Sequence, residues 1–457
     1  MGVMQINPAV AEEMFVTDRN GKKSFDEGAF AEHLVTTSGL ICSDGHLYSR
    51  TGEVISRQKC EQEIYEILRG LGMTQNLAAR VKSLYEVIKI QAFVEHIETP
   101  LNQIAVQNGT ITVDLQTGEF RFTEEMMFSR QRLNCKFDPT KPVKPPKRFF
   151  EWVEGLIHDY DRDGFQEFCG YLLIPCTKLQ KAMILLGRGQ EGKSRIGLIL
   201  HYLFGAACVS SSLGYFEENQ YSMPRAQNRL VLFQDDLKKD KLKSTETFKM
   251  MVSAEIPVQA EEKHERAYSF QPFARWVICS NAPLAALYDN GHGFYRRLYM
   301  IRVKNRPEDR VDDAFYFEPM MNEMDGIFIW MLQGLQRLIQ NKWQLSISAE
   351  SKALVEEQQE GENSLVPFMR ERLSFGRGYS ITTEKLYQSY VNFCAENQLY
   401  PRKKGDLKTF FDEQLDNLKI KVNKHLGDNR GQTGYSGMTL KATASVLDML
   451  NSGGDDK

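Results

Sequence analysis

The alternation of apolar and polar positions changes character three times along the chain. After a helical-looking beginning, residues 103–122 alternate apolar with polar side chains, and Asn108-Gly109 and Thr117-Gly118 stand where tight turns would fall. This stretch predicts a small β-meander. From about residue 150 to 345, short apolar runs alternate with amphipathic helical segments, which predicts an α/β domain with a largely parallel sheet. Residues 365–441 read as helices followed by a glycine-punctuated hairpin.

Domain boundaries follow from these changes. The segment KPVKPPKRFF at residues 141–150 holds three prolines and four cations, and it cannot continue a helix or a central strand. We expect an α+β amino-terminal domain over residues 1–145 and an α/β core over 146–345. A helical domain with a hairpin is expected over residues 346–445, and a disordered tail over 446–457.

Composition narrows the class of protein. Of 457 residues, 42% are hydrophobic and 26% charged, which argues against a largely disordered or fibrous chain. No apolar stretch approaches the ~18 residues that cross a bilayer, and the first residues lack the basic and apolar segments of a secretion signal. We therefore expect a soluble, unsecreted protein in the cytoplasm of a bacterial or host cell, with no membrane partner.

The cysteines and the net charge restrict the class of protein less than the composition does. The eight cysteines are scattered, with no C-x-x-C pair, so reduced and mostly buried thiols are expected. The net charge of −3 does not decide whether the chain binds nucleic acid, because a local basic surface can bind phosphate on an acidic protein.

The strongest local motif is GRGQEGKS, which follows the apolar run AMILL and precedes the helical segment RIGLILHYLF. It fits the phosphate-loop pattern G-x-x-x-x-G-K-[ST]. Glycines Gly187, Gly189 and Gly192 would let the backbone N–H groups wrap the phosphates of ATP, Lys193 would neutralise β/γ oxygens, and Ser194 would hold Mg²⁺. The alternative is an ordinary glycine-rich turn between a strand and a helix.

Two further apolar runs end in polar residues. LVLF leads into Asp235 and Asp236, and WVICS leads into Asn281. Ligands of open α/β sheets gather at the carboxyl ends of the strands. Asp235 is therefore the candidate Mg²⁺ ligand, Asp236 the candidate for polarising the attacking water, and Asn281 the candidate for orienting water or sensing the γ-phosphate. Acids also end strands for structural reasons, which is the alternative.

Two clusters of cations follow the same core. Arg296 and Arg297 precede another apolar run, and phosphoryl transfer gains from such a cation at the transition state. A salt-bridged strand entry is the alternative. Residues 256–270 predict a projecting β-hairpin whose charged tip carries Lys263, His264 and Arg266. These three could contact a nucleic-acid backbone, or could form a solvated loop.

The order of these parts resembles the superfamily 3 helicases of the AAA+ class, in particular the helicase part of phage, plasmid and poxvirus primase-helicases. The matching motifs, spread over most of residues 85–305, are GRGQEGKS, LVLFQDD, EEKHER, WVICSN and FYRR. The resemblance implies an AAA+ core, a hexameric ring with ATP between subunits, an arginine finger at Arg296 or Arg297, hairpins that follow single-stranded DNA, and 3′ to 5′ unwinding. Residues 1–85 are too short for that family's polymerising module, so primase activity is not expected.

The carboxy-terminal region is basic. Residues 401–441 contain nine Lys/Arg against five acids, an excess of +4. Helices followed by a hairpin with basic flanks look like a winged helix, which the same family commonly carries at this end. Lys403, Lys404 and Lys408 are the candidate DNA contacts, with a solvated helical cap as the alternative.

These interpretations combine into one expected function. The chain is expected to be an Mg²⁺-dependent ATP hydrolase, a DNA helicase that translocates on single-stranded DNA and separates duplex DNA in phage, plasmid or mobile-element replication. A separate primase, polymerase or initiator protein is a possible partner. The alternatives are an AAA+ remodeller or loader acting on a protein, and an ATP-regulated origin-binding protein without unwinding activity.

Overall fold

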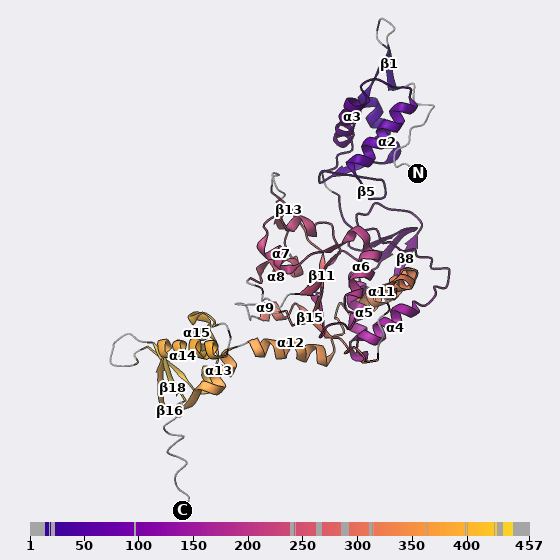
Figure 1. Cartoon of the computed structure of the whole chain (residues 1–457). Helices are drawn as coiled ribbons and strands as arrows, with labels where there is room; N and C mark the ends of the chain where they lie inside the picture. Colours follow the sequence, from indigo (N-terminus) through magenta and orange to yellow (C-terminus); the bar gives the residue numbers. More distant parts are fainter. Residues whose placement is uncertain are drawn as a thin grey trace, which may run out of the picture. The chain divides into compact units, whose positions relative to one another are not determined.

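The computed structural model describes residues 14–17, 19, 23–95, 97–237, 242, 244–261, 267–284, 292–309, 313, 315–362, 364–397, 399, 401–424, 426 and 433–441 (Figure 1). The chain divides into two compact units. The first comprises residues 1–239, 246–282 and 297–351, and the second comprises 240–245, 283–296 and 352–457. The expected disordered tail lies outside the described residues.

The amino-terminal part of the first unit is a small α+β assembly with its own apolar core. Three helices supply most of that core, through side chains such as Phe30, Ile64 and Leu84. The first helix begins after Asp26, whose carboxylate accepts hydrogen bonds from the N–H groups of Gly28 and Ala29. The elements are β1 (Phe15–Thr17), β2 (Lys23–Phe25), α1 (Glu27–Ser38), β3 (Ile41–Ser43), β4 (His46–Tyr48), β5 (Val54–Ile55), α2 (Arg57–Gly70) and α3 (Leu77–Gln91).

A three-stranded antiparallel meander follows, which confirms the prediction for residues 103–122. Its strands are β6 (Gln103–Val106), β7 (Gly109–Val113) and β8 (Phe120–Thr123), in the order β6-β7-β8. Its buried side chains, among them Ile104 and Ile111, belong to the same apolar cluster as the central sheet and its helices. The meander therefore packs onto the α/β core.

The centre of the first unit is a five-stranded sheet in which every neighbouring pair is parallel, as the sequence predicts. The strands lie in the order β10-β11-β14-β9-β15. They are β9 (Ala182–Leu186), β10 (Cys208–Ser210), β11 (Val231–Leu237), β14 (Arg275–Ser280) and β15 (Leu298–Arg302). All side chains of β9 and β14 are buried, because helices cover both faces of a parallel sheet.

Helices lie on both faces of the central sheet (Figure 1), and alternate residues of its strands face one helical layer or the other. Val277 and Cys279 face the layer that contains α4, α5, α6 and α11, whereas Trp276 contacts Phe216 of α7 on the other face. Helices α5 and α11 approach closely at Gly170 and Gly334, where an added Cβ would meet backbone atoms at 2.2 Å. The helices are α4 (Lys147–Leu156), α5 (Arg162–Tyr171), α6 (Arg195–Phe204), α7 (Leu213–Glu218), α8 (Glu246–Ser253), α10 (Phe317–Met321) and α11 (Met324–Gln340), with 3₁₀ turns η2 (Asp159–Asp161), η3 (Gly205–Ala207) and η4 (Met223–Ala226).

The predicted charged hairpin is present as an antiparallel pair, β12 (Val258–Ala260) and β13 (Tyr268–Phe270). Its tip, with Lys263, His264 and Arg266, lies outside the described residues.

The second unit contains helices and a three-stranded antiparallel sheet in the order β16-β18-β17. The hairpin of β17 and β18 agrees with the sequence pattern, but the sequence predicted only helices before this hairpin, and the structure has strand β16 there. Only Leu373 and Ile381 of this ten-residue strand are buried, so its sequence shows no regular alternation. The elements are α9 (His292–Tyr295), α13 (Leu365–Arg372), β16 (Leu373–Thr382), α14 (Thr383–Glu396), α15 (Lys404–Glu413), α16 (Leu415–Leu418), β17 (Lys421–Asn423) and β18 (Gly434–Leu440); α12 (Ala349–Glu362) joins the units.

Two further expectations concern the whole chain. All eight cysteines are buried free thiols, as predicted. In the part of the chain that the structure describes, every helix is too short or too polar to cross a membrane.

Candidate functional site

The phosphate-loop motif connects the end of β9 to the start of α6, as its sequence context predicts. The N–H of Gly187 donates to the carbonyl oxygen of Ser280 at 3.0 Å, which ties the start of the loop to the end of β14. Gly189 and Gly192 have φ values of +117° and +99°, which favour glycine. From helix α4, the indole N–H of Trp152 donates to the carbonyl oxygen of Gly192 at 3.1 Å. These contacts hold the loop in a compact turn.

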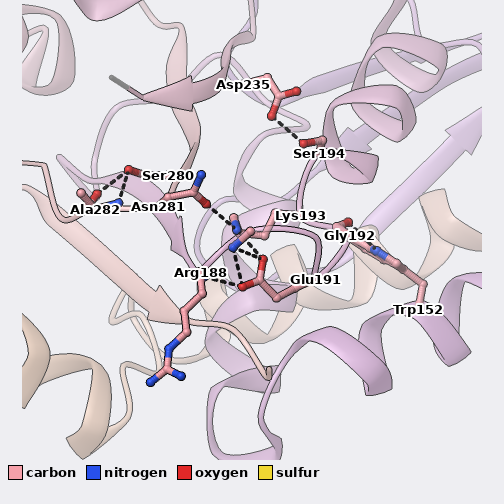
Figure 2. A network of polar contacts seen from close by, with 11 residues as sticks. Trp152, Arg188, Glu191, Gly192, Lys193, Ser194, Asp235, Ser280, Asn281 and Ala282 are labelled. Carbon is pink, nitrogen blue, oxygen red and sulfur yellow. Dashed lines mark hydrogen bonds and ion pairs between the residues drawn. The ribbon is translucent and has the colours of Figure 1, made fainter. Parts of the chain in front are cut away.

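The Lys193 ammonium lies in the middle of a polar network (Figure 2). Its Nζ donates to Glu191 Oε2 at 2.7 Å and to Asn281 Oδ1 at 3.1 Å. Because β14 lies between β9 and β11 in the sheet, Asn281 is placed beside the loop that follows β9. The structure thus brings together two of the residues predicted from separate strand ends.

Glu191 is the residue of this network that the sequence reasoning missed. Its side chain is 3% exposed, and its carboxylate also accepts from the backbone N–H groups of Arg188 and Gly189. Burial by itself raises the pKa of Glu191, but the hydrogen bonds from Lys193 and from backbone N–H groups outweigh burial and leave the pKa below its ordinary value. The carboxylate is therefore ionised at neutral pH.

The second predicted pair, Ser194 and Asp235, is in direct contact. Ser194 Oγ donates to Asp235 Oδ1 at 2.7 Å, and both residues are exposed. At this point β11 contains a bulge, because Asp235 and Asp236 together oppose one residue of β14. Asp236 has a φ of +55°, a rare value outside glycine, asparagine and aspartate. The bulge places both carboxylates at the same cavity.

That cavity has a volume of about 490 Å³, within the range of small-molecule sites. Its lining includes loop residues 189–194 and the three predicted residues Asp235, Asp236 and Asn281. Arg306 also lines it, with Nη1 3.4 Å from Gln190 Oε1. Sequence reasoning missed Arg306 because it lies in a loop after β15 with no motif around it. The described residues contain no group of three metal-ligating side chains, and Mg²⁺ at nucleotide sites needs only one or two carboxylates beside the phosphates.

The two candidate arginines differ in their surroundings. Arg297 is 9% exposed, and its guanidinium donates to Ser253 Oγ at 2.8 Å. Its carbonyl oxygen also accepts from the N–H of Ala182 at 2.8 Å. Arg296 is exposed. Of the pair, Arg296 has the side chain that another molecule could reach.

The candidate DNA contacts of the second unit lie at the start of α15. Lys403 occupies the N-cap position, and Lys404 forms an ion pair with Glu384 of α14. Lys408 is exposed on the same helix. Lys404 and Lys408 share α15 with Asp406 and Asp412, and Lys404 is already paired with Glu384.

Comparisons with known proteins give a partial family match and a fold. Residues 185–297 match a family of unknown function, DUF5906, and this segment runs from β9 to the residue before β15. No curated protein matches the chain significantly. The A form of the apo C-terminal region of NrS-1 is similar, with a TM-score of 0.50, at 12% identity over 90% of this chain and 100% of that chain. Another apo structure of the NrS-1 C-terminal region has a TM-score of 0.46, at 13% identity over 91% of this chain and 100% of that chain. The first of these supports a shared mixed α/β fold.

Proposed function

We propose that this chain is an Mg²⁺-dependent ATP hydrolase of the AAA+ type, which translocates on single-stranded DNA and unwinds duplex DNA during replication of a phage, plasmid or mobile element. The observation that carries the proposal is the convergence of four predicted polar side chains at one cavity. Lys193 contacts Asn281, and Ser194 contacts Asp235. These contacts join the phosphate loop to two separate strand ends, as a nucleotide site requires.

The loop supplies the groups that would hold the triphosphate of ATP. Residues 189–194 of the loop line the cavity, among them Lys193, and α6 begins directly after them at Arg195. A helix N-terminus and a lysine both favour phosphate. Arg306, at the same cavity, adds a second cation.

Ser194 and Asp235 fit an Mg²⁺ ion. A hydroxyl and a carboxylate oxygen 2.7 Å apart, both accessible from the cavity, are hard oxygen ligands of the type that Mg²⁺ takes in phosphoryl-transfer sites. When bound, the ion would neutralise charge on the phosphate oxygens.

The hydrolytic water would be oriented by Asp236 and Asn281. Asp236 lies on the bulge next to the metal-side carboxylate, and Asn281 presents its amide beside Lys193. Asp236 is exposed, and a carboxylate at this position can accept a proton from water. We assign Asp236 as the general base and Asn281 as the residue that contacts the γ-phosphate.

We further propose that the active form is a ring, hexameric by resemblance, in which Arg296 reaches the ATP of the neighbouring subunit. The exposure of Arg296 and the burial of Arg297 favour this assignment. DNA would be followed by the β12–β13 hairpin and held by Lys403, Lys404 and Lys408 at the start of α15, with the second unit acting as a winged helix.

A tailed-duplex assay tests the proposal against its alternatives. A purified protein with ATPase that single-stranded DNA stimulates, and with ATP-dependent strand displacement, supports the helicase. ATPase that responds to a protein but not to DNA favours a remodeller, and duplex binding without displacement favours an origin-binding protein. Lys193→Ala is the control, because it removes the cation at the phosphate loop and should abolish turnover.

A further inference from the structure

The anion-binding groups of the phosphate loop already hold an anion, the carboxylate of Glu191. It accepts from the backbone N–H of Arg188, from the N–H of Gly189 at 2.8 and 2.9 Å, and from Lys193 Nζ at 2.7 Å. Consecutive backbone N–H groups and a lysine ammonium are the donors that a phosphate group takes at such a loop. Glu191 therefore satisfies the same donors that ATP would need.

The surroundings show that this is a closely fitted arrangement. The side chains of Lys193 and Glu191 are 7% and 3% exposed. A Cβ on Gly187 would lie 2.7 Å from Lys193 Nζ and 2.8 Å from Glu191 Oε1, so the space for the ion pair exists because residue 187 is glycine. Both charges are thus buried against the loop backbone, where removing one of them would leave the other without compensation.

We propose that Glu191 is an internal phosphate mimic that sets the affinity of the site for ATP, because the incoming phosphate must take over the donors that Glu191 occupies. The proposal rests on the nucleotide site proposed above. Glu191 stabilises the loop without nucleotide by neutralising Lys193 and satisfying two N–H groups. When ATP binds, its triphosphate replaces the carboxylate of Glu191 at these donors. The Glu191 side chain then rotates away from the loop backbone toward the cavity, which it already lines.

A purely structural role for Glu191 makes the opposite prediction. If the carboxylate holds the loop in its binding conformation and stays in place, its loss weakens ATP binding. If Glu191 competes with phosphate, its loss destabilises the protein without ligand but strengthens ATP binding, because no ion pair has to be broken. A lower melting temperature together with tighter ATP binding therefore indicates the phosphate mimic, whereas a lower melting temperature together with weaker ATP binding indicates a structural role.

The experiment compares the wild type, Glu191→Gln and Glu154→Gln. Glu154 is an exposed carboxylate on α4, so its variant removes the same charge without touching the loop. ATP and inorganic pyrophosphate serve as probes, with calorimetry for affinity and thermal melting for stability. We expect Glu191→Gln to melt lower without ligand, to bind ATP about tenfold more tightly, and to gain more stability from pyrophosphate, since hydrogen bonds between charged groups are of that strength. Glu154→Gln should match the wild type.

Each other outcome has a defined meaning. ATP affinity in Glu191→Gln that equals or falls below that of a binding-competent wild type overturns the mimic and leaves the nucleotide site standing. If folded wild type and folded Glu191→Gln both fail to bind ATP and pyrophosphate, the nucleotide site itself is wrong, and the mimic fails with it. If Glu191→Gln does not fold, Glu191→Asp replaces it. That variant keeps the charge beside Lys193 but retracts it from the N–H groups, and unchanged or weaker ATP binding there also overturns the proposal.

Discussion

At the residue scale, Gly187 is where the loop backbone passes directly beside the Lys193–Glu191 ion pair. An alanine here would place its Cβ within 2.8 Å of both charged groups and of Val303 Cγ2. We expect Gly187→Ala to weaken ATP binding about five- to 150-fold, because the nearest displaced atom is the Lys193 ammonium and overpacking costs about 1–3 kcal/mol. Calorimetry with ATP measures the loss.

Gly214→Ala is the matched control for this substitution. Gly214 lies in α7, and a Cβ added there meets no atom within 4 Å. The control should keep wild-type ATP affinity and gain slightly in helix stability. Normal ATP binding by a folded Gly187→Ala protein would show that the ion pair can shift without loss, and would count against the phosphate-loop assignment of Lys193.

At the element scale, the bulge in β11 gives two adjacent carboxylates different contacts and backbone conformations. Asp235 contacts Ser194, whereas Asp236 takes a left-handed backbone conformation at the same cavity. We expect Asp236→Asn to keep ATP binding but to lower turnover by at least 10²-fold, because asparagine tolerates this conformation and only the proton acceptor is lost. Single-turnover ATP hydrolysis beside ATP binding measures the difference. Loss of binding in Asp236→Asn would instead make Asp236 a metal or structural residue.

The β12–β13 hairpin carries the prediction for DNA tracking. Its strands are paired, and between them in sequence Lys263, His264 and Arg266 carry up to three positive charges within four positions. Sequence-independent phosphate contacts weaken as salt rises. The triple alanine variant should lose strand displacement and show a shallower salt dependence of single-strand binding. Unwinding of a tailed duplex at the wild-type rate by this variant would place DNA tracking elsewhere.

The same elements show how far the sequence alone could reach. The meander, the parallel sheet and the charged hairpin were predictable because their strands alternate regularly or form short apolar runs. Strand β16 was not, because Gly376 and Gly378 interrupt it and its partner β18 lies about sixty residues further along the chain. Pairing between distant segments leaves no local periodicity to detect.

For the candidate site, sequence reasoning found the residues at strand ends and missed those that depend on loop geometry. Asp235 and Asn281 follow apolar runs, so their shared edge could be inferred before the sheet was seen. Glu191 occupies one of the unspecified positions of the phosphate-loop pattern. Only the folded loop shows that its carboxylate turns back onto Arg188, Gly189 and Lys193.

At the scale of the whole molecule, we expect substitutions of the two adjacent arginines to have different effects, one on stability and the other on ATP turnover. Arg297 is buried against Ser253, so Arg297→Ala should lower the melting temperature by several degrees, since a buried charged hydrogen bond contributes about 1.5–3 kcal/mol. Arg296 is exposed, so Arg296→Ala should lower the melting temperature less than Arg297→Ala does. Thermal melting of the two variants separates a buried structural arginine from one whose side chain is exposed to a neighbouring molecule.

If Arg296 acts across a subunit boundary, Arg296→Ala should lower ATP turnover by ~10³–10⁵-fold, as removal of arginine fingers does in related phosphoryl-transfer enzymes. The decisive measurement mixes Arg296→Ala subunits with Lys193→Ala subunits, each inactive alone. In a mixed ring, some interfaces combine the intact phosphate loop of one subunit with the intact Arg296 of the next, so ATPase should partly return. Recovery should follow the mixing ratio and peak near equal amounts, because that ratio gives the most mixed interfaces. Subunit exchange is verified independently by pull-down of differently tagged chains. Absence of recovery despite exchange would place Arg296 in the same subunit as the ATP it serves, and the ring would then not be needed for hydrolysis.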